Sequence, residues 1–308
     1  MKKSLAGAVA LAFVGLTLAG CTADPGTSDA TATDTATDSA IQTQTLNTDL
    51  AAGLPDAIKE SGEIVSVNTG SFPPYLIVGD DNHVTGASAD LGVAIGEILG
   101  VDITHSTVDG LASVLTGMEA GRYDLDLGPI GDFTERQSQA QFIDYVQEFV
   151  VFAVEAGNPK EIVDLDSTCG TKIAVQAAGS AERVINTQSE ACVAAGNEAV
   201  EIQAYKDQPS SILAVQSGRA DAFFSSQAPL TYFVEQSDGA LELSGVGEKN
   251  GFDDLFQGAV VPLGSTLGDT VLAAIEILHE NGTYNEIMEK WNLEGNILET
   301  PGLNLGKS

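Results

Sequence analysis

The sequence predicts an α/β protein with two α/β units, and three observations support this class. Short runs of β-branched residues alternate with segments of helical apolar spacing, which is typical of parallel strands joined by crossover helices. The alternation runs through residues 63–130 and starts again at Lys172. The roughly 250 residues after Leu50 are rich in Gly, Ala, Val and Leu, which is enough to form two cores.

The first unit should contain three strands separated by two helices. The first helix stops at Gly100, and Gly121 lies just beyond the end of the second. The expected strands are 63–67, 101–106 and 125–130, and the expected helices are 89–99 and 111–120.

The second unit repeats this pattern, and a helical portion follows it. In open α/β sheets, ligands bind beyond the carboxyl ends of the strands, so the loops after Val67, Ile130, Val175 and Phe224 are the expected pocket loops. The further elements are expected as strands at 172–176 and 220–224, helices at 181–188 and 210–217, a long helix from about residue 270, and a shorter one through residue 291.

The first twenty residues have the pattern of a signal peptide that is removed from the mature protein. Lys2 and Lys3 supply the positive charge, and residues 5–18 form an apolar stretch that is too short for a comfortable membrane span. The stretch ends in Leu-Ala-Gly followed by Cys21, which resembles the lipobox of bacterial lipoproteins. We therefore expect Cys21 to carry a diacylglycerol; the alternative is an ordinary signal peptide with a chance cysteine.

The composition changes sharply after the lipobox. Residues 22–49 are mostly Thr, Ala, Asp and Ser, and such a stretch cannot bury enough apolar surface to offset the entropy of ordering it. Residues 21–55 are therefore expected to be the lipidated N-terminus and a disordered tether, with a reach on the order of 30 Å.

The charge of the chain excludes two classes of partner. The chain has 13 basic and 44 acidic residues, and removal of Lys2 and Lys3 leaves 11 basic residues and a net charge of −33. This charge argues against nucleic acid and against binding to anionic lipid through a basic patch. Beyond the signal peptide, no segment approaches eighteen consecutive apolar residues, so no further membrane span is expected.

Cys169 and Cys192 are expected to form a disulfide, because bonded cysteines persist in exported proteins. The bond would close a loop of about two dozen residues and contribute about 3 kcal/mol. Two unpaired buried thiols are the alternative. A metal site is not expected, since His83, His105 and His279 do not lie at a ligand spacing from these cysteines.

Short sequence landmarks occur in order along nearly the whole folded chain. They include Ser-Phe-Pro-Pro-Tyr at 71–75, Gly-Arg-Tyr-Asp at 121–124, Thr-Glu-Arg at 134–136, Phe-Ile-Asp-Tyr at 142–145, Ser-Gly-Arg-Ala-Asp-Ala at 217–222 and Asn-Gly-Thr-Tyr at 281–284. Together they resemble the cluster 3 extracellular solute-binding proteins, a group that mostly serves polar amino acids. The resemblance implies a periplasmic-binding-protein-like fold, in which two α/β lobes joined by a two-stranded hinge close on a ligand like a clamshell.

The resemblance also places the lobe boundaries. Lobe 1 is expected at 56–149 plus 256–299, and lobe 2 at 150–255. The chain would cross between the lobes at 148–150 and again at 255–257, and these two crossings would form the hinge.

By the same resemblance, Arg136, Phe72 and Ser180 bind the ligand. The family's arginine binds the α-carboxylate of the ligand with two parallel N–H donors, a task that suits a planar guanidinium; a surface arginine paired with Asp132 or Glu135 is the alternative. Phe72 would stack on the side chain of the ligand, unless it is an ordinary core residue. Ser180 is expected at a helix N-terminus, where backbone N–H groups are available to an anionic oxygen.

One position departs from the family. Where the family usually carries an aspartate that pairs with the ammonium of the ligand, this chain has Ser226. An ammonium in a closed cleft needs a compensating carboxylate. Asp132 is expected to replace the missing aspartate, with Glu182 as the reserve candidate. The alternatives are that Asp132 only neutralises Arg136 in the empty site, or that the ligand is not an ordinary α-amino acid.

These features predict a solute-binding lipoprotein on the outer face of the cell membrane that serves an ABC importer. Its partners would be a small carboxylate-bearing ligand, such as an amino acid, and the permease and ATPase of the importer. The protein is expected to act as a monomer without a cofactor or a metal, and not as an enzyme. The alternatives are a ligand sensor for a membrane signalling partner, and a dehydratase-like enzyme on the same fold, which would need a placed general acid.

Overall fold

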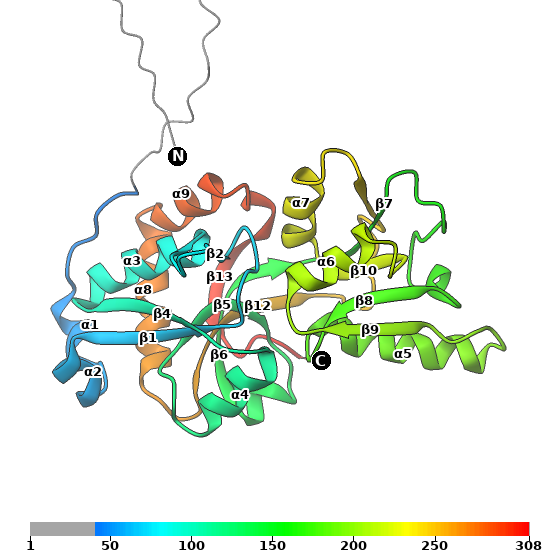
Figure 1. Cartoon of the computed structure of the whole chain (residues 1–308). Coiled ribbons are helices and arrows are strands. Elements are labelled where there is room, and N and C mark those ends of the chain that lie inside the picture. Colours follow the sequence, from blue (N-terminus) through cyan, green and yellow to red (C-terminus); the bar gives the residue numbers. More distant parts are fainter. Residues whose placement is uncertain (1–40, 308) are drawn as a thin grey trace, which may run out of the picture. The chain divides into compact units, whose positions relative to one another are not determined.

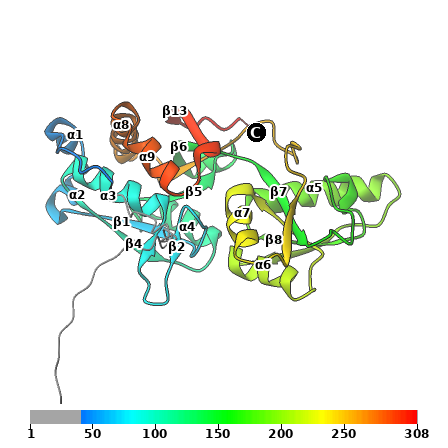
Figure 2. The same cartoon turned by 90° about the horizontal axis from the view of Figure 1, so that it is seen from above.

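The computed structural model describes residues 41–307 and contains two α/β lobes (Figure 1). The predicted signal peptide, Cys21 and the first part of the predicted tether lie outside the described residues. The lobes are named here by their sheets, and Figure 2 shows the two sheets and their helices from a second direction. The α/β class predicted from the sequence is confirmed.

Lobe 1 is built on a mixed sheet with helices on both faces. The sheet has the order β13-β6-β12-β5, and a parallel pair, β1 and β4, continues it through a bridge between Ser66 and Leu125. The strands are β1 (Glu63–Asn68), β4 (Asp102–Thr107), β5 (Asp126–Gly131), β6 (Ala140–Glu148), β12 (Leu255–Pro262) and β13 (Ile297–Leu303). The helices are α1 (Thr48–Ala52), α2 (Asp56–Ser61), α3 (Ala87–Leu99), α4 (Leu111–Glu119), α8 (Leu267–Glu280) and α9 (Thr283–Lys290).

The remaining elements of lobe 1 are short. They are the hairpin strands β2 (Ile77–Val78) and β3 (Val84–Thr85) and the 3-10 turns η1 (Arg136–Ser138) and η3 (Glu294–Asn296). Gly100 ends α3 with a φ of 69°, a left-handed conformation that favours glycine, as the sequence pattern indicated.

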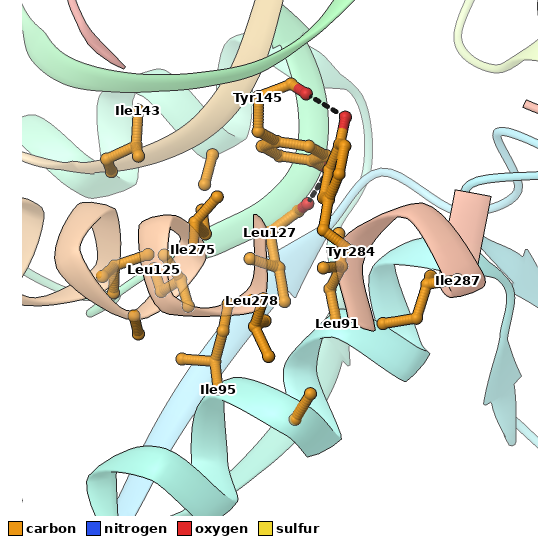
Figure 3. Close-up of a cluster of buried hydrophobic side chains, with 14 of the residues drawn as sticks. Leu91, Ile95, Leu125, Leu127, Ile143, Tyr145, Ile275, Leu278, Tyr284 and Ile287 are labelled. Atoms are coloured by element: carbon orange, nitrogen blue, oxygen red, sulfur yellow. Dashed lines mark hydrogen bonds between the residues drawn. The ribbon is translucent and has the colours of Figure 1, made fainter. Parts of the chain in front are cut away.

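The core of lobe 1 lies between its sheet and the helices α3, α8 and α9 (Figure 3). Two tyrosine hydroxyls are buried in this apolar layer, and both are hydrogen-bonded to backbone oxygens. The hydroxyl of Tyr284 donates to the backbone oxygen of Tyr145, and the hydroxyl of Tyr145 donates to the backbone oxygen of Leu127 at 2.7 Å. Burying polar groups in this way is tolerated because they are hydrogen-bonded. The apolar side chains of this core include Leu91, Ile95, Leu125, Leu127, Ile143, Ile275, Leu278 and Ile287.

Lobe 2 is built on a sheet of order β11-β7-β10-β8-β9, in which β8 pairs in parallel with both β9 and β10. Helix α5 packs on one face of this sheet, and helices α6 and α7 pack on the other. The strands are β7 (Val150–Glu155), β8 (Lys172–Gln176), β9 (Glu201–Tyr205), β10 (Ala222–Ser226) and β11 (Leu241–Ser244). The helices are α5 (Ser180–Ala194), α6 (Gln208–Gln216) and α7 (Gln227–Glu235), with a 3-10 turn η2 (Asp166–Thr168).

The expected disulfide is present in lobe 2. Cys169 follows η2, and its sulfur is bonded to that of Cys192 in α5. Both residues belong to the apolar layer under α5, so the bond attaches the helix to the segment before β8.

The chain crosses between the lobes at Phe149, between β6 and β7, and again just before β12, where Leu255 pairs with Glu148. These crossings are adjacent. The precise residue limits of each lobe stay a prediction, but strand β13 continues beyond residue 299 to Leu303 and belongs to the sheet of lobe 1.

Residues 41–55 differ from the prediction of a disordered tether. The side chain of Asn47 accepts hydrogen bonds from the backbone N–H groups of Asp49 and Leu50 and so caps α1. The backbone N–H of Asn47 donates to the oxygen of Ile98 at 2.8 Å, and Leu54 is buried against lobe 1. These tertiary contacts order a segment whose composition alone indicated disorder.

Candidate functional site

A cleft lies between the two lobes, where the carboxyl ends of strands from both sheets meet. It contains about 690 Å³ of empty space, part of which is open to solvent. This is the place where open α/β sheets bind ligands, and the strand-end loops expected from the sequence contribute to it. The cleft residues at the ends of β1, β5, β8 and β10 are Asn68, Gly131, Gln176 and Ser226.

Arg136 lines the cleft at the point where the lobes meet. It begins η1, and its Nη1 donates to the oxygen of Gly131 at 2.7 Å, while Nη2 donates to the oxygen of Ala178 in lobe 2. These bonds occupy two of the five N–H donors of the guanidinium and leave three for other acceptors. Burial and the neighbouring Arg183 lower the pKa of Arg136 to about 10, so the side chain stays protonated at neutral pH.

Phe72 also lines the cleft, on the loop that follows β1. Its ring stacks on that of Tyr75, with the ring centroids 5.7 Å apart. The hydroxyl of Tyr75 donates to Oε1 of the buried Glu148 at 2.6 Å, which connects this loop to the crossing between the lobes. Phe72 is only partly buried, so one part of its ring remains available in the cleft.

Ser180 lies at the N-terminus of α5 and lines the cleft, whereas Glu182 has another role. Oε2 of Glu182 accepts a hydrogen bond from the backbone N–H of Ala178 at 2.7 Å and closes the turn before the helix. This resembles the reciprocal half of a capping box, in which a side chain at the third helical position reaches back. Glu182 is absent from the cleft lining, so the structure does not support it as the reserve ligand for an ammonium.

Ser226 is buried, lines the cleft, and lies at the start of α7. Nε2 of Gln257 donates to its Oγ at 3.2 Å. Oε1 of the same Gln257 is buried without a hydrogen-bond partner among the described residues. The pair therefore offers a hydroxyl and an unused amide oxygen, and no charge, where the family usually has an aspartate.

Asp132 is not in the cleft, and this corrects the expectation that it replaces the missing aspartate. Its side chain is 2% exposed, and both carboxylate oxygens accept hydrogen bonds from Nε2 of Gln137, at 2.9 and 3.0 Å. The backbone N–H of Gly306 donates to it at 2.7 Å. Asp132 follows Gly131, the last residue of β5, and its carboxylate is turned to Gln137 and Gly306, neither of which lines the cleft. The structure therefore does not support an exchange of roles between Asp132 and Ser226 across the cleft.

Asp126 was missed by the sequence reasoning and lies in the cleft wall. It begins β5, is 2% exposed, and accepts a hydrogen bond from the backbone N–H of Gly128 at 2.8 Å. Burial raises the pKa of Asp126 well above its ordinary value, and the bond from Gly128 opposes this only in part. The available signal was an acidic residue inside the apolar run 125–130.

Further polar side chains, also missed, complete the cleft. Nε2 of Gln208 donates to Oε1 of Gln176 at 2.8 Å, and its Oε1 accepts from the hydroxyl of Ser225 at 3.0 Å. Asn68 accepts two hydrogen bonds through Oδ1, while its Nδ2 has no partner among the described residues. A cleft with apolar walls and a few directed polar groups is typical of sites for small molecules.

Neither a metal site nor a membrane span is found in residues 41–307. No three or more His, Cys, Asp and Glu side chains of this region are grouped so that they could hold a metal ion. Each helix of the same region is too short or too polar to cross a bilayer.

The fold and the cleft define a two-lobe binding protein of the periplasmic type. The sequence profile of the bacterial extracellular solute-binding proteins, family 3, matches residues 64–294, and the chain belongs to this family. The resemblance drawn from the sequence landmarks is thereby confirmed.

Individual relatives have low sequence identity to this chain. The arginine-binding protein ArgT of Corynebacterium glutamicum is 27% identical over 261 residues, which cover 83% of this chain and 83% of the relative. The L-cystine-binding protein TcyJ of Escherichia coli K12 is 24% identical over 251 residues, covering 78% and 86%. A solved structure of an ancestral arginine-binding protein bound to glutamine is 25% identical, with a TM-score of 0.67, and covers 76% of this chain and 99% of that one.

Proposed function

We propose that this protein captures an amino acid outside the cell membrane and delivers it to an ABC importer. The observation that carries the proposal is the position of Arg136. Its guanidinium lies in a cleft between two lobes, held by backbone oxygens of both, with N–H donors to spare. A planar guanidinium in this setting suits the carboxylate that every amino acid carries.

The other cleft residues fit the same ligand class. Phe72 offers an aromatic face to a side chain or an aliphatic stem. Ser180 lies at the N-terminus of a helix, where backbone N–H groups and the helix dipole favour an anionic oxygen. Gln257 and Ser226 offer neutral oxygens near Gly131, the residue that Arg136 contacts, because Gln257 pairs with Gly131 across the sheet.

The relatives support this ligand class without fixing the ligand. Their names describe arginine-binding and L-cystine-binding proteins, and one related structure holds glutamine. They are binding proteins, and we infer that this chain is likewise a binding protein and not an enzyme. The lipobox at Cys21 would hold it at the outer face of the membrane, where the permease of the importer, which the ATPase drives, receives its ligand.

A binding screen of matched analogues tests the proposal. Each amino acid is compared, by thermal shift and calorimetry, with the amine that lacks its carboxylate and with its des-amino acid. We expect at least one amino acid to raise the melting temperature and to bind measurably, and its decarboxylated amine to bind at least thirtyfold more weakly, because the buried guanidinium loses its partner. Failure of every amino acid to bind, with the protein folded, would contradict the proposal.

A further inference from the structure

Asp126 is a buried acid with little compensation from the protein. Among residues 41–307, the hydrogen bond recorded for its carboxyl comes from the backbone N–H of Gly128, and no lysine or arginine of this region forms an ion pair with it. The side chain is nevertheless 2% exposed and part of the cleft wall. Burying a carboxyl without a charged partner is unfavourable, so packing of the lobe 1 core gives no reason for an acid at this position.

The position of Asp126 relative to Arg136 sets the length of the ligand. The carboxyl of Asp126 accepts a hydrogen bond from the backbone N–H of Gly128, and the guanidinium of Arg136 donates one to the backbone oxygen of Gly131. Three residues of an extended strand separate these points by about 10 Å. The acid and the arginine therefore lie at two ends of the cleft face of β5.

The wall between these ends is apolar. Pro129 and Ile130 lie between Gly128 and Gly131 in β5 and line the cleft, as do Phe72 and Leu76 from the loop after β1. A Cβ at Gly128 would lie 3.9 Å from Cδ1 of Leu76, an ordinary van der Waals distance, so Leu76 lies beside this part of β5. This stretch suits an aliphatic stem better than a polar one.

We propose that Asp126 binds a cationic group at the far end of the ligand side chain, and that the cleft takes amino acids with a basic side chain. This inference rests on the proposed function, in which Arg136 binds the α-carboxylate. The α-ammonium cannot be the group that meets Asp126, since it lies only about 3 Å from the carboxylate of its own molecule. The cation of a basic side chain lies several bonds beyond the α-carbon, so it can approach Asp126 while Arg136 holds the α-carboxylate.

The polar groups at the arginine end agree with this orientation. Near Gly131 the cleft offers the Ser226 hydroxyl and the unpartnered Oε1 of Gln257, both neutral. These oxygens can accept hydrogen bonds from an α-ammonium. The carboxyl that can carry a full negative charge lies instead at the other end of the strand, at Asp126.

Binding of a cation beside Asp126 should change the protonation state of its carboxyl. Burial favours the neutral form of Asp126 in the empty cleft, and a cation beside it favours the ionised form. The carboxyl therefore releases a proton to solvent when a basic ligand binds. The titratable group beside Asp126 is Tyr145, whose pKa is raised far above its ordinary value by burial, and Arg136, whose pKa is about 10, lies at the other end of the cleft. Neither changes its charge between pH 6 and pH 8.

Calorimetry on the full-length protein in detergent tests the inference with two matched pairs of probes. L-Arginine is compared with L-citrulline, and L-lysine with L-norleucine, because each pair differs mainly in the side-chain charge. We expect the wild-type protein to bind one basic probe about thirtyfold or more tightly than its neutral partner. Asp126→Asn should bring this ratio close to one. In buffers of different ionisation enthalpy, proton release should accompany the basic probe and not its neutral partner.

Asp132→Asn is the matched control, since Asp132 is buried to the same extent in lobe 1 but lies outside the cleft. It should leave the ratio unchanged. A wild-type ratio near one, a ratio that survives Asp126→Asn, or binding of the basic probe without proton release would overturn the inference and leave the role of Arg136 intact. If no amino acid binds at all, the proposed function itself fails. Should Asp126→Asn not fold, the wild-type ratio and the proton release decide the question.

Discussion

The carboxylate of Asp132 accepts a hydrogen bond from the backbone N–H of Gly306, and this bond fixes residues 303–306 to the loop that carries Arg136. The preceding residue, Leu305, donates its backbone N–H to Asp144 at 2.9 Å. Asp144 lies beside Asp132, and burial together with this neighbouring carboxylate raises the pKa of Asp144. Two buried acids thus depend on the same short segment for their hydrogen bonds.

A chain that ends at Leu303 should be less stable, with little change in ligand affinity. This truncation removes the hydrogen bond from Leu305 to Asp144 and the one from Gly306 to Asp132. A buried acceptor that is left without a donor costs about 1–3 kcal/mol of stability. Urea unfolding with and without ligand measures both effects. An unchanged midpoint would show that these bonds contribute nothing to stability.

Arg136→Ala should abolish measurable binding of the amino acid while the protein remains folded. Truncation of one partner of a buried, hydrogen-bonded charge pair costs 2–5 kcal/mol, or about thirtyfold to several thousandfold in affinity. Arg136→Lys should restore binding only in part, because lysine lacks the planar fork. The matched control is Arg183→Ala, which also removes a guanidinium from the ring of Phe133 but lies outside the cleft lining. Near-normal binding by Arg136→Ala would exclude the carboxylate role.

Glu148, the buried acid at the lobe crossing, should make the free energy of unfolding depend on pH. Burial raises the pKa of Glu148 from 4.5 to about 7, although hydrogen bonds from Tyr75 and Phe149 oppose the shift. Between these pH values the folded state holds a proton that the unfolded state has lost. The free energy of unfolding should therefore fall by about 3 kcal/mol as the pH rises from 4.5 to 7, and change little above that.

Glu148→Gln tests this dependence, because it keeps an acceptor for Tyr75 without a titrating group. Urea unfolding at pH 5 and pH 7.5 should show a smaller loss of stability in the variant than in the wild type. The buried Asp126 and Asp144 act in the same direction, so the difference between the two proteins is the quantity to measure. Equal slopes would rule out Glu148 as the titrating group.

Removal of the disulfide should weaken lobe 2 and spare the binding site. The bond spans 23 positions of sequence, and closing such a loop in the unfolded chain contributes about 3 kcal/mol. Neither Cys169 nor Cys192 lines the cleft. The double serine variant should lose stability in denaturant unfolding and keep its ligand affinity; a large change in affinity would contradict this separation.

Cys21→Ser should release the protein from the membrane or stall its processing. Cys21 lies outside the described residues, so this prediction depends on the sequence of the lipobox. Cell fractionation and mass spectrometry of the mature N-terminus provide the measurement. Membrane association that survives the substitution would remove the lipoprotein interpretation.

Most strands next to the cleft were predictable from the pattern of the chain itself, whereas the crossing near residue 149 could be placed only through the family resemblance. The run 125–130 corresponds to β5 within one residue, and the strand-end rule identified loops that line the cleft. By contrast, residues 140–155 contain no glycine, proline or other turn signal. The structure divides this run at Phe149 between β6 in one sheet and β7 in the other, a choice that depends on tertiary packing.

The two aspartates of β5 and its following loop show why the site was only partly predictable. Sequence proximity to Arg136 favoured Asp132, but Asp132 lies just after the end of β5, where Gln137 and Gly306 hold its carboxylate outside the cleft. Asp126 is ten residues away from Arg136 in sequence and shares its cleft. Likewise, the polar composition of 41–55 could not reveal the bond from Asn47 to Ile98.

Gly131 has no room for a methyl group, because a Cβ there would overlap Oγ of Ser180 from the other lobe. The lobes are thus in contact beside Arg136, with a single hydrogen atom filling the gap. A ligand held beside this contact is released more easily once Gly131 and Ser180 separate. Its residence time therefore depends on the rate at which the hinge opens as well as on the contacts that hold it, so an importer that pulls the lobes apart controls when the cargo is released.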